Sequence, residues 1–76
     1  MAMSRVHVQH RDGSPARHVR VVLGFSGIAG GMTKPAFTDG SGDAVVEHSS
    51  TGRATVYVSG SDCGSFHAPG TYAATV

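Results

Sequence analysis

Short runs of this chain alternate apolar and polar residues, and this period of two limits its fold more than any other feature. In residues 5–10, Val6 and Val8 alternate with polar side chains, and residues 18–25 repeat the pattern. Such alternation gives a β-strand one apolar face that can pack against a core. No window of a dozen residues has apolar positions at helical spacing, so the sequence predicts no significant helix.

Glycine, proline and aspartate divide the chain between these runs. Strands are predicted at residues 5–10, 18–25, 36–38, 43–48, 53–59 and 71–76. Segments 11–16, 26–34, 49–52 and 60–70 are predicted as turns or loops, because they are rich in residues that break strand pairing. This spacing predicts an all-β chain: one small β-sandwich over residues 1–76, with about six to seven strands and Greek-key connections.

The inward positions of these strands define the expected core. The alternation assigns to it Val6, Val8, Val19, Val21, Leu23, Phe37, Ala44, Val46, Val56 and Val58. Val22, Val45 and Tyr57 fall on outward positions and are expected at the surface. A domain of 76 residues buries only about 60% of its unfolded surface, so this core is small.

The middle of the chain, AFTDGSGDAVVEH, joins two predicted strands by a tight turn. Asp39, Ser41 and Asp43 also have the alternate-oxygen spacing of a calcium loop. Ala44 stands at the sixth position and Ser50 at the twelfth, where an EF-hand needs Gly and Glu. An EF-hand is therefore excluded. Asp39 and Asp43 remain weak metal candidates, and the stronger prediction is that Asp39 bonds the backbone of its own turn.

Three segments together resemble the transthyretin-like, or carboxypeptidase-regulatory-like, β-sandwich family. They are VHVQHRDGSPARHVRVVLGF, AFTDGSGDAVVEH and TGRATVYVSG. The positions that match the family pattern in order are Gly13, Pro15, Val19, Val21, Leu23, Thr38, Asp39, Gly42, Ala44, Val46, Gly52, Val56 and Val58. The resemblance implies a transthyretin-like or immunoglobulin-like sandwich. It implies little about activity, since such folds carry many functions.

One branch of that superfamily, the hydroxyisourate hydrolases, is enzymatic and has its own pattern. His7-Val8 and the Gly-Ser-Pro-Ala segment at residues 13–16 are similar to its opening motif, although the spacing here is shorter. The Tyr-Arg-Gly-Ser tail of that branch is absent, because this chain ends in TYAATV. Half of the hydrolase motif is missing, and His7 is interpreted as the outward-facing partner of Val6 and Val8.

Composition narrows the classes of partner. Charged residues make up 14% of the chain and the net charge is +1, which gives no electrostatic basis for binding nucleic acid or an anionic membrane. No apolar run reaches the length of a transmembrane helix, and the N-terminus lacks the apolar core of a signal peptide. The sequence does not indicate a cellular compartment, and no cofactor is expected.

Few residues carry chemistry. Cys63 is the only cysteine, which excludes an internal disulfide and a zinc finger. Cys63 and His67 lie four residues apart beside Asp62, so a thiolate and an imidazole could meet there for metal binding or nucleophilic attack. The alternative is that Cys63 is a small buried apolar residue. The five histidines are scattered and are expected at the surface.

The glycine-rich segment GFSGIAGGMTK does not match a phosphate-binding loop. Lys34 is followed by Pro35, which disfavours the helix that such a loop must open. Its apolar residues are Phe25, Ile28 and Met32, and they are predicted to cap the sandwich, with contact to a partner as the alternative.

The sequence therefore predicts a non-catalytic binding or structural module that self-associates or belongs to a larger protein. Its interaction candidates are Phe25, Ile28, Met32, Tyr57 and Phe66. One alternative is a small hydrolase or metal-binding protein that uses Cys63 and His67. Another is a carbohydrate-binding module, for which only Tyr57, Phe66 and Tyr72 could serve as aromatic platforms.

Overall fold

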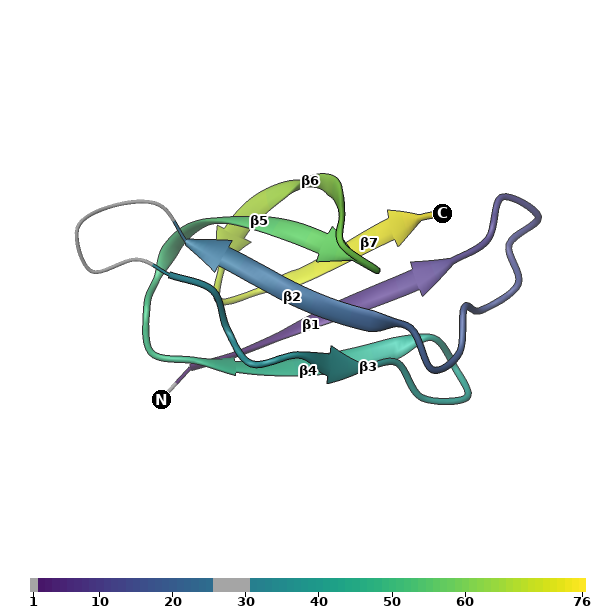
Figure 1. Ribbon diagram of the computed structural model, residues 1–76, viewed down its shortest axis with the longest axis horizontal. Coiled ribbons are helices and arrows are strands. Elements are labelled where there is room, and N and C mark those ends of the chain that lie inside the picture. Colours follow the sequence, from purple (N-terminus) through teal and green to yellow (C-terminus); the bar gives the residue numbers. More distant parts are fainter. Residues whose placement is uncertain (1, 26–30) are drawn as a thin grey trace.

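The computed structural model describes residues 2–25 and 31–76, and this part of the chain is all-β, without a helix. Within these residues seven strands form two sheets, which confirms the predicted small all-β sandwich of about six to seven strands (Figure 1). The strands are β1 (Ala2–Gln9), β2 (Arg20–Phe25), β3 (Ala36–Phe37), β4 (Asp43–His48), β5 (Gly52–Val58), β6 (Ser61–Ala68) and β7 (Thr71–Thr75). One sheet has the order β4-β1-β7 and the other the order β3-β2-β5-β6.

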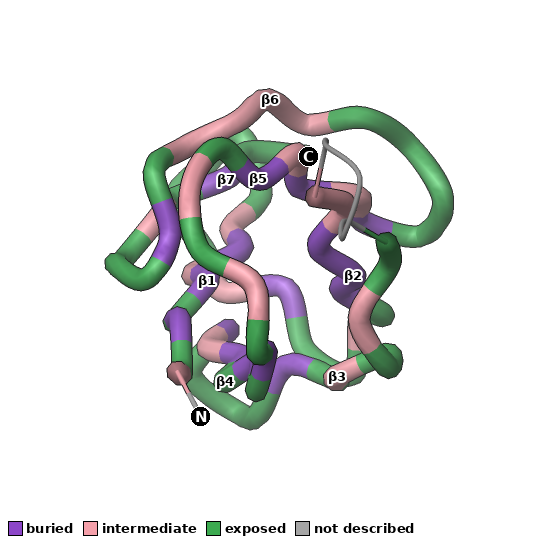
Figure 2. Tube along the Cα trace, turned by 90° about the vertical axis from the view of Figure 1, so that its left-hand side faces the viewer, coloured by how far each residue is buried: buried purple, intermediate pink, exposed green. Residues whose placement is uncertain are grey.

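The chain crosses between the two sheets several times, which joins them into one sandwich. β1 lies in the middle of the three-stranded sheet, antiparallel to β4 and parallel to β7. In the other sheet β2 pairs with β3 and β5, and β5 pairs with β6, all antiparallel. Figure 2 shows the buried residues gathered in these strands around a common interior.

The core follows the alternation of the sequence. Leu23 is its largest fully buried side chain, and it lies opposite Val56 on the neighbouring strand. The buried apolar cluster consists of Val6, Val8, Ala16, Val21, Leu23, Ala44, Val46, Ala54, Val56, Val58, Ala68 and Ala74. Val19 packs against this cluster but is only partly buried. Five members of this cluster are alanines.

The prediction that Phe37 belongs to the core is wrong. Phe37 is 61% exposed, because it lies opposite Arg20 and shares the outward face of that residue. Ala36, opposite Val21, takes the inward position. The two-residue strand β3 is too short for alternation to decide which residue points inward.

Val22 is on the outward face as predicted, but it is not exposed. Its exposed fraction is 4%, and it lies opposite Tyr57 of β5. The Tyr57 ring lies over Gly24, where an added Cβ would come within 2.9 Å of Cε2. Val45, also on an outward position, is 52% exposed as predicted.

The prediction of a loop at residues 60–70 is also wrong, because Ser61–Ala68 forms strand β6. β6 pairs with β5 along its length, with a β-bulge where Cys63 and Gly64 both lie opposite Val56. Gly64 has a φ of +114° there. The bulge breaks the period of two, and small polar residues hide what remains of it.

The turn in the middle of the chain is the corner where β3 leaves one sheet and β4 enters the other. The buried hydroxyl of Thr38 donates to the Ala16 carbonyl at 2.6 Å and accepts from the Val19 amide at 2.9 Å. Asp39 Oδ1 accepts from the amides of Ser41 and Asp43 at 2.8 and 3.1 Å. The prediction that Asp39 bonds its own turn is confirmed.

Candidate interaction surfaces and polar sites

The two acidic metal candidates already have partners within the protein. Asp39 Oδ1 accepts the two turn amides, and Asp43 Oδ1 lies 2.9 Å from His7 Nδ1. Both carboxylates therefore hold the corner in place. In residues 2–25 and 31–76, no three His, Cys, Asp or Glu side chains are grouped so that they could hold a metal ion.

The hydrogen bonds to Asp39 make the corner sensitive to acid. The amides of Asp43 and Ser41 lower the pKa of the Asp39 carboxyl below its ordinary value of 3.8. A carboxyl with a depressed folded-state pKa stabilises the fold fully above its ordinary value, and this stabilisation is lost as the pH falls through the folded-state pKa. We expect Asp39→Asn to be less stable than the parent at neutral pH and to lose less stability between about pH 5 and pH 2.

The measurement is urea denaturation across that pH range. Glu47→Gln is the control, because Glu47 is an exposed carboxylate on β4, outside the turn. An Asp39→Asn variant whose stability varies with pH as steeply as the parent's would contradict the assignment.

Cys63 and His67 are not brought together. Both lie on β6, where four residues of extended strand span roughly 13 Å. Cys63 packs against the core cluster, whereas His67 is exposed and lies opposite Arg53. The bulge between them places the thiol on the inner face and the imidazole on the outer face.

A buried polar network lies where β1 begins and β4 ends. Ser4 is 2% exposed and His48 is 6% exposed, and Ser4 Oγ lies 2.8 Å from His48 Nε2. His48 Nδ1 lies 2.6 Å from the Ser50 carbonyl, which can only accept, so Nδ1 carries a proton. In the neutral imidazole Nε2 then accepts from the Ser4 hydroxyl. The Gly70 amide donates to Ser4 Oγ at 3.2 Å.

Hydroxyl, imidazole and carbonyl in this order resemble an activated nucleophile, but burial gives them another role. A nucleophile has to reach its substrate, and neither Ser4 nor His48 offers more than a trace of surface. The network instead ties β1, β4 and the β6–β7 turn together. The expectation that the histidines lie at the surface is wrong for His48. His48 follows Ala44 and Val46 at intervals of two residues, so it lies on the same buried face of β4, and this spacing was the sequence signal for its burial.

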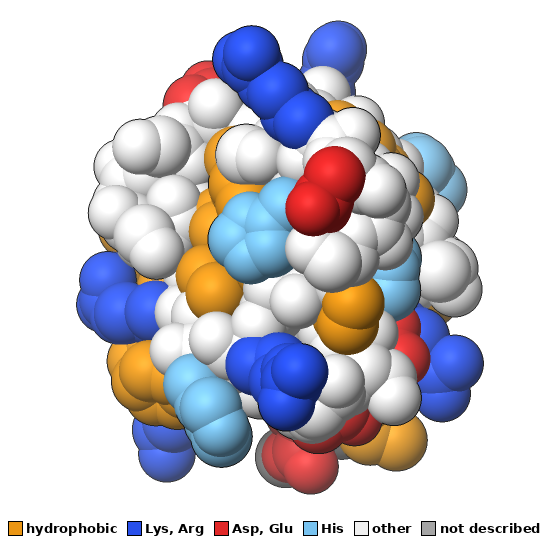
Figure 3. All heavy atoms as spheres, turned by 90° about the vertical axis from the view of Figure 1, so that its right-hand side faces the viewer, with side chains coloured by type: hydrophobic (Ala, Val, Ile, Leu, Met, Phe, Trp, Pro, Cys, Tyr) orange, Lys and Arg blue, Asp and Glu red, His pale blue; other side chains and the backbone are white. Residues whose placement is uncertain are grey.

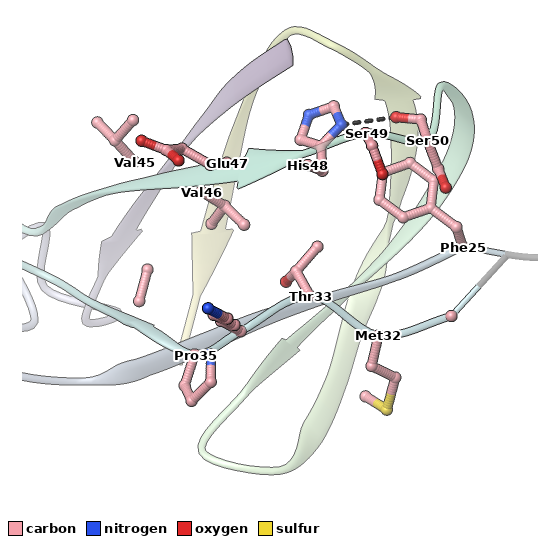
Figure 4. A pocket seen from close by; sticks show the side chains of 13 residues that line it. Phe25, Met32, Thr33, Pro35, Val45, Val46, Glu47, His48, Ser49 and Ser50 are labelled. Carbon is pink, nitrogen blue, oxygen red and sulfur yellow. Dashed lines mark hydrogen bonds between the residues drawn. The ribbon is translucent and has the colours of Figure 1, made fainter. Parts of the chain in front are cut away.

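A cleft opens along the seam between β4 and the segment that leads into β3. Its volume is about 600 Å³, and Figure 4 shows Val46 and Thr33 pointing into it from its two sides. Met32 points away from the cleft and is 66% exposed. The prediction that Met32 caps the sandwich is therefore wrong. Phe25 lines the cleft and tilts against the His48 ring at a centroid distance of 5.1 Å.

The other interaction candidates have different environments. Phe66 packs against the core and stacks on Tyr72 at a centroid distance of 5.5 Å, so most of its surface is used internally. Tyr57 is partly exposed on the outer face of the four-stranded sheet. Ile28 lies outside the described residues.

Charge is scattered over one end of the molecule. The end of the molecule shown in Figure 3 mixes cationic, anionic and histidine side chains, and its hydrophobic side chains form small separate patches. Such a mixture does not steer a strongly charged ligand to this end.

No family model matches the chain, and no curated protein is similar to it in sequence. Within the described residues, no helix has the length and apolar character needed to cross a lipid bilayer.

Proposed function

We propose that this domain is a non-catalytic protein-interaction module of the transthyretin-like kind, and that its partner is a second copy of itself. Five residues considered above for catalysis or metal binding have structural tasks. Ser4 and His48 join three strands in a buried network, and Cys63 packs on the core. Asp39 and Asp43 hold the corner between the two sheets.

The positions that carry the family resemblance support the proposed kind of fold. Thr38 and Asp39 bond the backbone at the corner between β3 and β4. Gly42 has a φ of +82° and lies against the Val8 carbonyl and Pro15. Each of these residues has a backbone role that another side chain would disrupt, which explains why the motif combines them.

The outer strands are the features that favour association. Exposed edges present unpaired amide and carbonyl groups, and proteins protect them with short strands, proline, charge or bulges. β3 has two residues and follows Pro35, β4 carries Asp43 and Glu47, and β6 has its bulge at Gly64. Among the outer strands of the two described sheets, β7 has none of these protections. The unprotected β7 edge is the observation that carries the proposal.

The oligomeric state tests the proposed function. We expect the molar mass from light scattering to rise from monomer towards dimer as the protein concentration is raised, since edge pairing is a bimolecular equilibrium. A monomer mass at every concentration up to millimolar would overturn the proposal.

A further inference from the structure

We propose that two copies pair through their β7 strands, antiparallel and centred on Ala73, to make one continuous six-stranded sheet. This inference rests on the proposed self-association and names its surface and register. The hydrogen bonds between β1 and β7 show which backbone groups of β7 point outward. The Arg5 amide donates to the Gly70 carbonyl, and the Val76 amide donates to the Gln9 carbonyl. Even-numbered residues of this strand therefore bond to β1, and the amides and carbonyls of Thr71, Ala73 and Thr75 point outward.

One antiparallel register uses all of these outward groups. When Ala73 lies opposite Ala73 of the second copy, Thr71 lies opposite Thr75 of the second copy, and Thr75 opposite Thr71. All three outward residues of each strand then exchange backbone hydrogen bonds. A register shifted by two residues in either direction leaves one of the three beyond the end of the other strand.

The side chains are complementary in the same register. Thr71 and Thr75 form a cross-strand threonine pair on each side of the two-fold axis, and such pairs stabilise antiparallel sheets. The two Ala73 methyl groups meet at the axis without crowding. Val76, which is 43% exposed, lies opposite Gly70 of the second copy, beside Pro69.

Charge separates β7 from β4, the other long regular edge. β7 carries no charged residue. The two Arg5 residues lie on the β1 strands, opposite Thr71, so they are separated by three strand spacings and also offset along the strands, and they stay more than about 14 Å apart across the dimer. On β4 the Val8 amide bonds the Gly42 carbonyl, so the backbone of Val45 and Glu47 points outward. Self-pairing centred on Val45 sets Glu47 opposite Asp43 of the second copy, and self-pairing centred on Glu47 sets Glu47 opposite Glu47. Like charges in direct opposition destabilise a sheet in both registers.

The edge of β6 is closed in a different way. The Tyr72 hydroxyl donates to the Cys63 carbonyl at 2.8 Å, and the Gly64 amide donates to Asp62 Oδ1 at 2.9 Å. These bonds occupy the backbone at the bulge. The first bond also holds the Tyr72 side chain on the inner side of β7, against the core cluster and away from the outward backbone edge of that strand.

The size of the edge sets the expected affinity. Five residues of strand span roughly 17 Å, so the interface is smaller than that of a standard stable complex. The dimer is therefore weak and forms at high protein concentration. Its population rises further wherever two copies are tethered to each other.

Cysteine cross-linking tests the register in a Cys63→Ala background, which removes the native thiol. Residues opposite each other in a hydrogen-bonded antiparallel pair have Cα atoms about 5.5 Å apart, within the range that a disulfide spans. We expect Ala73→Cys to form a covalent dimer under mild oxidation. Thr71→Cys alone should remain monomeric, since its copies lie roughly 13 Å apart along the strand. A mixture of Thr71→Cys and Thr75→Cys should cross-link.

Val45→Cys is the matched control, an exposed position on the outer face of β4 that should form only a trace of covalent dimer. Circular dichroism of each variant verifies that the fold is retained. If the parent is dimeric by light scattering and Ala73→Cys does not cross-link beyond the Val45→Cys control, the β7 interface is wrong while self-association stands. If Thr71→Cys cross-links with itself, the two β7 strands pair in a different register and the proposed register is wrong. A parent that is always monomeric would overturn both proposals.

Discussion

Gly42→Ala should destabilise the domain by more than about 2 kcal/mol, since a left-handed backbone and a steric clash act together at this position. Gly42 has a φ of +82°, and a Cβ built on it would come 2.5 Å from the Val8 carbonyl oxygen and 3.1 Å from Pro15 Cβ. That carbonyl cannot move freely, because it accepts the Ala16 amide at 2.9 Å. For a 76-residue domain, whose total stability is about 4 to 11 kcal/mol, the loss is a large fraction.

Urea denaturation followed by circular dichroism measures the effect. Gly40→Ala is the control within the same turn, because nothing lies within 4 Å of its added Cβ. Gly40→Ala should change stability by less than about 0.5 kcal/mol. Equal effects of the two substitutions would contradict the described corner.

Leu23→Ala should cost about 2 to 5 kcal/mol, the range for removing a fully buried large side chain and leaving a cavity. Leu23 has no exposed surface and is the only leucine of the chain. Its backbone is also fixed, because its amide donates to Thr33 Oγ1 and its carbonyl accepts the Thr33 amide. Neighbouring strands therefore have little freedom to collapse into the cavity.

The same denaturation experiment checks this expectation. Val45→Ala, at a position that is 52% exposed, is the control and should cost less than about 0.5 kcal/mol. Leu23→Met keeps most of the volume and should cost less than about 1.5 kcal/mol. A Leu23→Ala variant as stable as Val45→Ala would mean that the two sheets do not pack on Leu23.

Much of the fold could be predicted because alternation and turn chemistry act locally. Val6, Val8, Val21 and Val56 were assigned to the core by their period alone, and each is fully buried. The turn at Asp39 was predicted because the side chain of an aspartate that precedes glycine commonly accepts hydrogen bonds from backbone amides a few residues further along the chain. These signals depend on a few neighbouring residues and need no knowledge of the other sheet.

The wrong predictions involve interactions between distant segments. β6 was missed because its bulge and its small polar residues hide the alternation, and only pairing with β5 defines it as a strand. Phe37 was assigned to the core with the inward positions of the other strands, although the pairing of β3 with β2 places it opposite Arg20 and turns it outward. A strand of two residues carries too little alternation to supply that register.

The polar sites show the same contrast between local signals in the sequence and contacts between distant segments. Spacing placed Cys63 and His67 together, and the bulge in β6 separates them onto two faces. The Ser4–His48 contact joins residues 44 apart in sequence, so no local motif contains it. Both residues do lie in phase with buried valines of their strands, and this phase was the available signal.

Hydrogen–deuterium exchange at two protein concentrations shows whether the β7 edge is the dimer interface. We expect the amides of Thr71, Ala73 and Thr75 to exchange quickly in dilute protein and more slowly in concentrated protein. The outward amides of Val45 and Glu47 on β4 should exchange at the same rate in both samples. If the three β7 amides exchange at one rate in both samples, under conditions where light scattering shows a dimer, the dimer does not form through β7.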